Sequence, residues 1–389
     1  MIKIGARNSP LARAQVDLVA AALAAHGLDS EFVPIRTQGD VDRRELTQIG
    51  GTGVFTAAVR DRLLDGSIDL AVHSLKDLPT APVDGLEVVA YPVREDTHEV
   101  LVVRDPRVLS LSKDPNLSQD RSHDGSQDSA KEDRPDPTLG RPLVIGTGAP
   151  RRAAQLRQLA EDRGIELVTE PIRGNVDTRL QKVRDGAYDG TVLAAAGLRR
   201  LHRLDGDASA GMSVGGLPAA VLPYHELLPA PGQGALALEV STALDSRIRA
   251  VLTRLDDAVT RAEVLAERQF LAVLEAGCTA PVGARARFTS ASADLGTASV
   301  VGADDRTVRD SGTDLTLVAV IGKTRGDEEC QRTRSGAEST ELQDHSNDSV
   351  VSRGRLVTVR GSGDDPIALG RRLAELALGV VDPKEFRTA

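Results

Sequence analysis

Strand-like and helix-like segments alternate along two long stretches of this sequence, at about 1–104 and about 141–194. This alternation restricts the possible folds more than any other feature. Short apolar runs are each followed by a segment whose apolar side chains recur at helical spacing. Such alternation is typical of a parallel sheet covered by helices. Both stretches are therefore predicted to form α/β domains.

Local signals set the limits of several elements. Ser9 is a suitable N-cap, Pro10 suits the first helical position, and Gly27 is a usual helix end. Together with the apolar spacing, such signals predict strands and helices along most of the chain. The strands are expected at 2–5, 31–35, 70–73, 86–91, 100–104, 143–147, 166–170 and 190–194, and the helices at 10–27, 56–65, 150–163, 176–185, 257–274 and 366–378.

The chain of 389 residues is too long for one ordinary domain, and its composition changes sharply twice. Ser, Asp, Lys and Pro dominate 105–140, which has few large apolar side chains and is predicted to be a disordered acidic insertion. A second polar insertion is expected at about 323–352. The predicted division is domain 1 at 1–104 plus about 229–250, domain 2 at 141–228, and a small α+β domain 3 at 251–389.

The composition argues against several classes of function. Aromatic residues make up 2% of the chain and Trp is absent, which disfavours nucleic-acid binding by base stacking. The net charge of −9 gives no general attraction for a polyanion. No apolar run has the length of a membrane span, and neither a signal-peptide core nor a zinc-like Cys/His spacing is found. With only two cysteines, a reducing cytoplasm and no metal are expected.

The strongest functional signal lies in 68–79 (IDLAVHSLKDLP). An apolar run that reads as a strand ends in His73, Ser74, Lys76 and Asp77, and a proline then stops it. Open α/β sheets present their chemistry at the carboxyl ends of strands. The segment therefore predicts that a cation and a carboxylate face a ligand at this strand end.

Arg151 and Arg152 fall in the first turn of a predicted helix, where the macrodipole disfavours cations. The pair is costly unless an anion binds between the guanidinium groups and the free backbone N–H groups. The alternative is that both side chains point into water. The preceding turn of Gly146, Thr147 and Gly148 favours the anion site. On this interpretation, Arg152→Leu is expected to keep or raise thermal stability while losing activity.

Two further strand-to-helix junctions repeat this arrangement. Arg173 precedes a helix that Asn175 caps, and Arg179 lies one turn inside it. Near the N-terminus, Arg7 and Ser9 stand before the first helix. Arginine suits carboxylates and phosphates because its fork binds them with two hydrogen bonds. The three junctions predict a cleft that collects several such anionic groups.

Cys278 follows the long predicted helix in the loop 275–281. It is either a buried structural thiol or a covalent attachment point, and the absence of a neighbouring His disfavours a Cys–His nucleophile. Cys330 lies beside acidic residues, which disfavour a thiolate, and is given no role. The glycines of 50–53 lack a Walker lysine, so a flexible turn or lid is favoured over a nucleotide loop.

Seven motifs occur in one order along the chain: 7–12 (RNSPLA), 50–55 (GGTGVF), 73–79 (HSLKDLP), 150–152 (PRR), 173–176 (RGNV), 231–235 (PGQGA) and 275–278 (EAGC). In this order they resemble the motifs of the hydroxymethylbilane synthase family, also called porphobilinogen deaminases. They cover nearly the whole chain outside the two polar insertions. Taken together they are highly specific.

The resemblance implies three domains, the first two folded like the lobes of type II periplasmic binding proteins. It implies a transferase that condenses four porphobilinogen molecules head to tail, with loss of ammonia, to give hydroxymethylbilane. It also implies a dipyrromethane cofactor, held by a thioether to Cys278, and Asp77 as the catalytic carboxylate. Cofactor-binding positions would be Ser74, Lys76, Thr147, Arg151, Arg152, Arg173 and Gly174, and substrate-binding positions Arg7, Ser9, Arg179 and Gln233. A monomer with porphobilinogen as its partner, but no nucleic acid or membrane, is expected.

The chain departs from the family pattern in two places. Gln48 and Thr52 stand where many members have lysines around the glycine turn. The run 147–149 (TGA) replaces a common Thr-Ser-Ser, which removes two hydroxyl donors that backbone N–H groups can replace. Two rival interpretations remain from the residues alone. A solute-binding protein of the same fold would have no use for Cys278, and a nucleotide-dependent transferase would need a glycine fingerprint that is absent.

Overall fold

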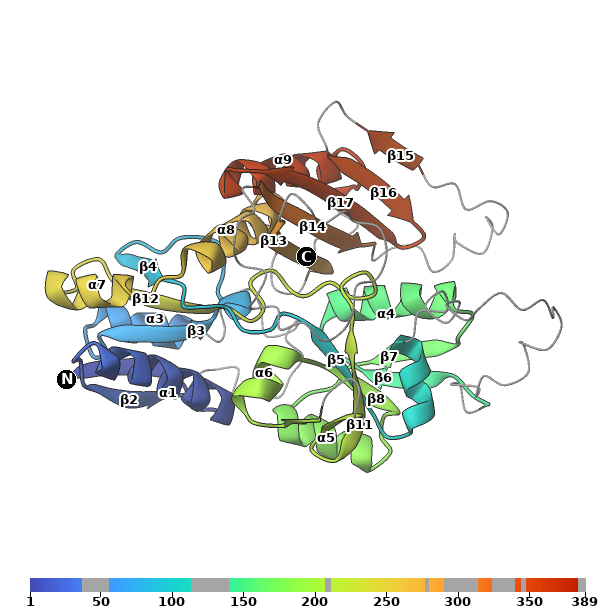
Figure 1. Ribbon diagram of the computed structural model, residues 1–389, viewed down its shortest axis with the longest axis horizontal. Coiled ribbons are helices and arrows are strands. Elements are labelled where there is room, and N and C mark those ends of the chain that lie inside the picture. Colours follow the sequence, from blue (N-terminus) through green and yellow to red (C-terminus); the bar gives the residue numbers. More distant parts are fainter. Residues whose placement is uncertain are drawn as a thin grey trace.

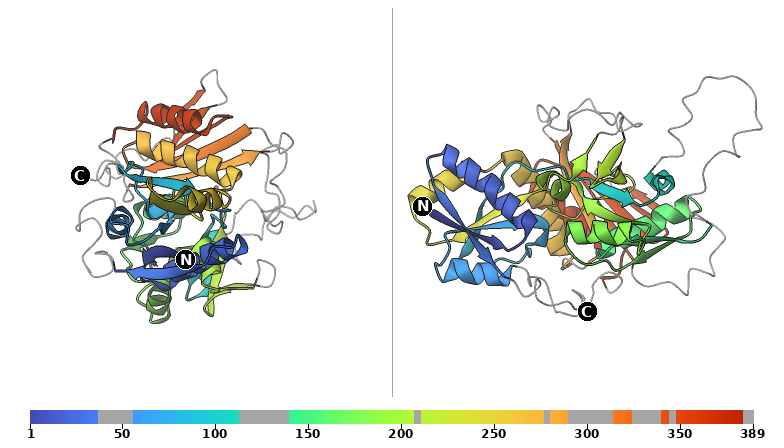
Figure 2. Two further views of the ribbon diagram at one scale, coloured as in Figure 1. Left: turned by 90° about the vertical axis from the view of Figure 1, so that its left-hand side faces the viewer. Right: turned by 90° about the horizontal axis from the view of Figure 1, so that it is seen from below.

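The computed structural model describes residues 1–36, 56–112, 140–206, 211–276, 280–289, 314–323, 340–343 and 348–383. These residues form three sheets, each with its own helices. Domains 1 and 2 lie side by side, and domain 3 lies against both of them (Figures 1 and 2). The α/β class and the three-domain architecture expected from the sequence are therefore confirmed. None of the described helices combines the length and the hydropathy needed to cross a membrane.

Domain 1 is built on a five-stranded sheet with the order β2-β1-β3-β12-β4. Strand β1 pairs in parallel with β2 and β3, whereas β12 lies antiparallel between β3 and β4. Apolar side chains on one face pack under helix α1, with Ile4, Leu23, Leu70 and Leu238 fully buried. The elements are β1 (Ile2–Arg7), α1 (Pro10–Ala25), β2 (Ser30–Ile35), α3 (Ala57–Leu64), β3 (Leu70–Ser74), β4 (Leu86–Ala90), β12 (Leu236–Ser241) and α7 (Ser246–Thr253).

Domain 2 has a seven-stranded sheet with the order β7-β6-β8-β5-β11-β10-β9. Strand β6 is parallel to β7 and β8, and β5 is antiparallel to β8 and β11. The elements are β5 (Glu99–Val103), β6 (Leu143–Gly146), α4 (Pro150–Asp162), β7 (Leu167–Glu170), α5 (Val176–Arg184), β8 (Gly190–Ala194), α6 (Ala195–Arg200), β9 (Leu204–Asp205), β10 (Met212–Val214) and β11 (Leu217–Leu222).

Strand β5 corrects the predicted limit of domain 1. The sequence analysis assigned 1–104 to domain 1, but β5 lies inside the sheet of domain 2, between β8 and β11. All five of its residues are buried, because the strand has neighbours on both edges and apolar cores on both faces. A short apolar run predicts a buried strand but not the sheet that receives it. The chain therefore crosses between the domains before β5, within 91–98.

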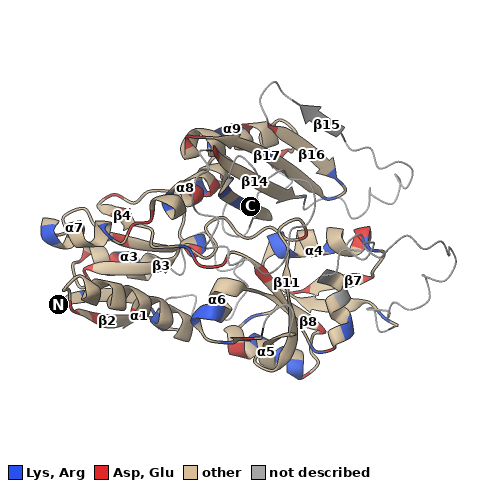
Figure 3. Ribbon diagram, in the orientation of Figure 1, with Lys and Arg blue, Asp and Glu red and all other residues tan. Residues whose placement is uncertain are grey.

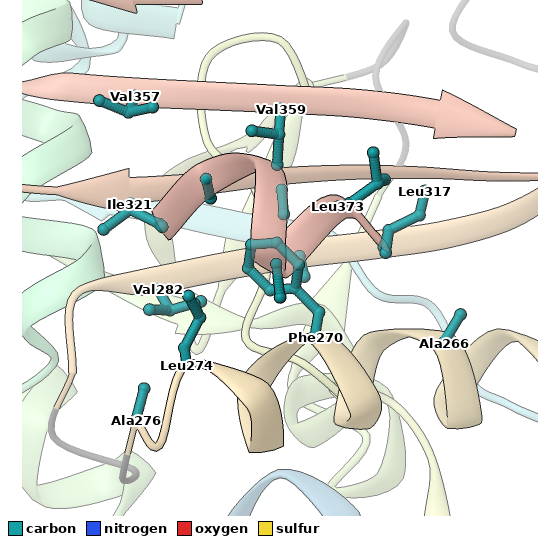
Figure 4. Packing of buried hydrophobic residues seen from close by; sticks show 14 of the residues in the cluster. Ala266, Phe270, Leu274, Ala276, Val282, Leu317, Ile321, Val357, Val359 and Leu373 are labelled. Carbon is teal, nitrogen blue, oxygen red and sulfur yellow. The ribbon is translucent and has the colours of Figure 1, made fainter. Parts of the chain in front are cut away.

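Domain 3 is an antiparallel sheet with the order β13-β14-β17-β16-β15, covered by two helices. Figure 4 shows Phe270 of α8 and Leu274, which directly follows this helix, packed with Leu373 of α9 against the sheet residues Leu317 and Val359. The elements are α8 (Ala258–Val273), β13 (Val282–Thr289), β14 (Asp314–Gly322), β15 (Thr340–Gln343), β16 (Ser349–Arg353), β17 (Leu356–Gly363) and α9 (Pro366–Leu378).

The polar insertion expected at 323–352 is wrong in its second half. Strand β15 and most of β16 lie inside this range, and both belong to the sheet of domain 3. Val350 is buried in the core of that domain. In an antiparallel sheet with one solvated face, alternate residues of a strand are polar, so the composition of such a strand can be close to that of a polar loop.

The disordered insertion expected at 105–140 begins too early. Residues Pro106–Ser112 form the 3₁₀ helix η2, and Val108 and Leu111 are buried against Leu143 and Leu227 of domain 2. Two large apolar side chains were enough to anchor this segment. Residues 113–139 lie outside the described residues, and their predicted disorder stays a prediction.

Replacing 113–139 with a short Gly/Ser linker should leave melting temperature and turnover close to those of the intact chain, because this part has few apolar residues to bury. The matched variant removes 105–139 and so loses Val108 and Leu111 as well. It should be destabilised by about 1.5–3 kcal/mol for each lost aliphatic side chain. Thermal unfolding of both variants measures the difference. Loss of folding in the first variant would show that 113–139 packs on the body of the protein.

Candidate active site

The loop after strand β3 carries Lys76 and Asp77 in the 3₁₀ helix η1 (Leu75–Asp77). Leu75 and Leu78 on either side are buried, and the backbone N–H of Leu75 donates to the carbonyl of Ala235 at 3.0 Å. Two buried leucines therefore fix the polar residues between them at the strand end. This is the placement that the sequence predicts for this segment.

The facing loop 231–235 (PGQGA) depends on glycine. Gly232 has a φ of +75°, and a Cβ there would lie 2.9 Å from the Cγ atom of Leu75. Gly234 also has a positive φ, of +84°. Any other residue at these two positions would be strained; at Gly232 it would displace Leu75, and at Gly234 its Cβ would clash with the backbone oxygen of Glu95. The loop therefore needs glycine in order to support η1.

A cavity of about 70 Å³ in domain 1 brings together several predicted site residues. Arg7 and Ser9 come from the β1–α1 junction, and Ser74 and Asp77 come from the end of β3. Ser9 caps α1 by accepting a hydrogen bond from the N–H of Ala12 at 3.2 Å. The first and third motifs of the sequence thus line one space.

Arg151 and Arg152 are not exposed: both side chains are buried, and both contact Glu99 at the start of β5. Arg152 binds Glu99 with two nitrogens, Nη2 at 2.7 Å and Nε at 3.1 Å, and donates from Nη1 to the carbonyl of Val192 at 2.8 Å. Arg151 donates to Glu99 and, at 2.9 Å, to the carbonyl of Leu228. The anion expected between these arginines is therefore in part the protein's own carboxylate.

This pairing overturns the expected effect of Arg152 on stability. Burial opposes the charge of Glu99, but Arg152 and Arg151 more than offset it and lower the pKa of Glu99 to about 2. Burial lowers the pKa of Arg151 to about 10, and Glu99 limits that shift. Removal of either arginine would leave a buried charge without its full compensation.

Lys76 connects the two lobes electrostatically. Its Nζ atom donates to Oε1 of Gln233 at 3.1 Å. Burial lowers the pKa of Lys76 to about 8, and the nearby Arg152 and Arg151 of domain 2 act in the same direction. Asp77 and Glu99 oppose this shift. Domain 1 thus presents a lysine to the arginine pair of domain 2.

Gln233 lies where the two crossing segments between the lobes meet. It is fully buried, and its Nε2 donates to the carbonyl of Thr97 at 2.9 Å. Arg94 donates to the carbonyl of Gln233 at 2.8 Å and binds Glu267 of α8 with two bonds of 2.8 Å. Burial opposes the charge of Arg94, yet Glu267 and Glu263 raise its pKa above the usual value. Gln233 is therefore held rigidly beside Lys76.

Arg173, Gly174 and Arg179 lie at the start of α5, which Asn175 caps by accepting from the N–H of Thr178 at 2.9 Å. Gly174 has a φ of +114°, and Arg179 donates from Nε to its carbonyl at 2.9 Å. Burial lowers the pKa of Arg179 to about 10, and repulsion from Arg152 and Arg173 adds to the shift. The positive charges of Arg152, Arg173 and Arg179 therefore act on one another within domain 2.

Thr147 lies in the turn before α4 and is buried. Its Oγ1 accepts from the N–H of Ala149 at 3.2 Å, and its own N–H donates to the carbonyl of Glu170 at 2.8 Å. Figure 3 shows Lys and Arg colouring the first part of α4 and the end of α6, both in domain 2. The described cations of the predicted site therefore come mainly from domain 2, and the carboxylate Asp77 comes from domain 1.

Comparison with known proteins decides the family. The family model described as "Porphobilinogen deaminase, dipyromethane cofactor binding domain" matches residues 2–250, and the one described as "Porphobilinogen deaminase, C-terminal domain" matches 261–342. The chain belongs to the porphobilinogen deaminase family. Members polymerise porphobilinogen into hydroxymethylbilane, so this chain is a transferase of tetrapyrrole biosynthesis. Its first two domains carry the family's dipyrromethane cofactor-binding region.

Individual relatives agree with the family. Porphobilinogen deaminase 1 of Streptomyces coelicolor is 44% identical over 336 residues, covering 86% of this chain and 88% of that protein. Porphobilinogen deaminase of Leifsonia xyli is 46% identical, covering 73% and 75%. Among solved structures, a periplasmic substrate-binding protein of an ABC transporter from Coxiella burnetii covers 67% of this chain and 94% of its own, at 12% identity and a TM-score of 0.35. Family membership rests on the sequence matches.

Cys278, the expected cofactor attachment point, lies outside the described residues, as do Gln48, Thr52 and Cys330. The residues on either side of the gap, Ala276 and Ala280, are both buried in the core of domain 3. The ends of the Cys278 loop are therefore anchored to the third domain of this porphobilinogen deaminase family member.

Three groups near the site are not apparent from the sequence. Glu99 is the first of these. The second is Glu239 of β12, which accepts from Arg60 at 2.8 Å and lies 3.0 Å from Nε2 of His73, a residue that lines the cavity. The third is Arg200 of α6, which donates to the carbonyl of Gly234 at 2.6 Å. None belongs to a local pattern, because each contact joins distant parts of the chain.

Proposed function

We propose that Asp77 is the catalytic carboxylate of this porphobilinogen deaminase family member, and that the cations around it bind the acetate and propionate groups of the pyrroles. One observation carries the proposal. Asp77 lines a cavity with Arg7 and Ser9, and the adjacent Lys76 is within electrostatic range of Arg151 and Arg152 of domain 2. Each pyrrole brings two carboxylates, which explains a local cluster of cations in a chain of net charge −9.

The chemistry needs one fixed carboxylate. In each coupling, the C–N bond within the aminomethyl group of porphobilinogen breaks: the protonated amine leaves as ammonia, and the CH2 carbon that remains is electron-poor. A C–C bond then forms to the free α-carbon of a second pyrrole, which loses its ring proton. Positive charge develops on pyrrole nitrogen in both steps, so Asp77 can stabilise that charge and hold the proton in transit.

The remaining roles follow from position. Arg7, Ser9, Arg179 and Gln233 are proposed to bind substrate. Gln233 also holds Lys76 in place through the 3.1 Å hydrogen bond. The proposed cofactor-binding set is Ser74, Lys76, Thr147, Arg151, Arg152, Arg173 and Gly174, of which Thr147 and Gly174 lie just before the starts of α4 and α5.

The donor set suits a cofactor that carries several carboxylates, and the electrostatic influence of Arg152 and Arg151 of domain 2 on the partly buried Lys76 of domain 1 supports this. Cys278 is proposed to hold this dipyrromethane through a thioether. When bound, the group supplies a tethered starting point, which makes each coupling partly intramolecular.

We also propose that the chain acts as a monomer in the cytoplasm, because the proposed site is complete within one chain and only two cysteines are present.

Intact mass spectrometry of the native protein should show an adduct of two pyrrole units, and peptide mapping should place it on Cys278. Cys278→Ser should fold but lack the added mass and the activity, since a hydroxyl is a poor replacement for the thiolate. Cys330→Ser is the matched control and should keep both. An unmodified native protein with full deaminase activity contradicts the tether, and an adduct on Cys330 contradicts the site.

A further inference from the structure

Glu99 is the one residue that contacts both members of the arginine pair within the described residues. Its side chain is fully buried at the first position of β5, between Ala194 of β8 and Leu222 of β11. Arg152 binds both of its oxygens, and Arg151 binds one of them. The strand pairing fixes the backbone of Glu99 on both edges. Its backbone is thus held by the sheet and its carboxylate by the two arginines.

Without this carboxylate, the surrounding charges would repel one another. The groups that act on Lys76 are Asp77 on its own segment, Arg151 and Arg152 on α4, and Glu99 on β5. Together with Lys76 these are five charged groups, of which Lys76, Arg151 and Arg152 are cations. The two arginines also lie at a helix N-terminus, where the macrodipole disfavours positive charge. Glu99 is the buried anion that offsets this repulsion on the domain 2 side.

We propose that Glu99 is a positioning residue of this active site: its ion pairs with Arg151 and Arg152 fix both guanidinium groups at the start of α4 and place a buried negative charge beside them. The inference rests on the proposed carboxylate-binding role of Lys76, Arg151 and Arg152. It assigns a role in the reaction to a residue that touches neither substrate nor cofactor. A purely structural ion pair would hold α4 on the sheet without affecting the charge of Lys76.

The test compares four variants with the native protein, one of them Lys76→Met. Glu99→Gln keeps the shape and removes the charge, and Glu99→Asp keeps the charge. Glu226→Gln is the matched control, because Glu226 is also buried and binds Arg163 at the other end of α4. Thermal stability, the fraction of protein carrying the two-pyrrole adduct, and kcat and KM for porphobilinogen against pH are measured for each variant.

Lys76 loses its proton as pH rises through its lowered pKa of about 8, so kcat/KM of the native protein should fall there. In Glu99→Gln this fall should move to lower pH by on the order of one unit, because a neighbouring anion is gone. KM should rise about tenfold or more, the equivalent of one charge-assisted hydrogen bond. The adduct fraction per folded molecule should fall, and Glu99→Asp should restore the pH position.

The Glu226→Gln control separates a role of Glu99 in positioning the arginines from a role in protein stability. Glu226→Gln should lose stability without moving the pH dependence or KM. If Glu99→Gln behaves like Glu226→Gln in pH dependence, KM and adduct fraction, Glu99 is structural only and the inference is overturned. Lys76→Met shows which proposal has failed. If kcat/KM of Lys76→Met still falls at high pH as in the native protein, the proposed role of Lys76 is wrong. The KM and the adduct fraction of Glu99→Gln then still decide whether Glu99 positions the arginines.

Discussion

Asp77→Asn should give a folded protein whose kcat is lower by on the order of 10²–10⁴, the usual contribution of a positioned acid–base or charge-stabilising group. Asp77 is exposed at the edge of the cavity, and the amide has the same shape as the carboxylate. The substitution removes the negative charge that would stabilise positive charge on pyrrole nitrogen. Substrate affinity should change little, because the proposed cations bind the carboxylates.

Steady-state assays of product formation, together with thermal unfolding, measure this effect. Asp61→Asn is the matched control, since Asp61 is an exposed carboxylate of α3 in the same domain. The control should keep native turnover. Turnover of Asp77→Asn within a few-fold of the native value would remove Asp77 from the mechanism and leave the cations as a binding site only.

Arg152→Leu should be destabilised by about 3–5 kcal/mol, because it breaks a buried pair and leaves Glu99 with one partner fewer. The sequence alone indicated the opposite result, since a cation in the first turn weakens an isolated helix. The ion pair with Glu99 outweighs the unfavourable interaction of the cation with the helix macrodipole, which is typically about 0.3–1 kcal/mol. Chemical denaturation gives the free energy of unfolding.

Arg157→Leu provides the comparison, because Arg157 is an exposed arginine of the same helix. It should stay within about 0.5 kcal/mol of the native stability. An Arg152→Leu variant as stable as Arg157→Leu would mean that Glu99 is compensated by Arg151 alone. In that case the loss of activity would report ligand binding rather than folding.

Features encoded by neighbouring residues were predictable from the sequence. The caps at Ser9 and Asn175 are present, and the last helix spans 366–378 as expected. Each depends on side chains a few positions apart, which a single sequence displays directly. The strand end that carries Lys76 and Asp77 was predictable for the same reason.

Features that depend on distant pairing were not predictable. Glu99 and Arg151 are 52 positions apart, and no local pattern links a strand-start glutamate to a helix-start arginine. Similarly, β5 reads as a buried strand of either sheet, and Val108 and Leu111 look isolated until their partners Leu143 and Leu227 are known. A single sequence gives the chemical type of such residues but not their neighbours.

The nesting of domain 2 within domain 1 sets an order of assembly during synthesis. All strands of the second sheet, from β5 to β11, leave the ribosome before β12, which must enter the first sheet between β3 and β4. The first lobe therefore stays incomplete while the second one closes, with two open strand edges in its centre. The loop that carries Asp77 hydrogen-bonds to Ala235 just before β12. The proposed catalytic residue is thus translated early and fixed in place late.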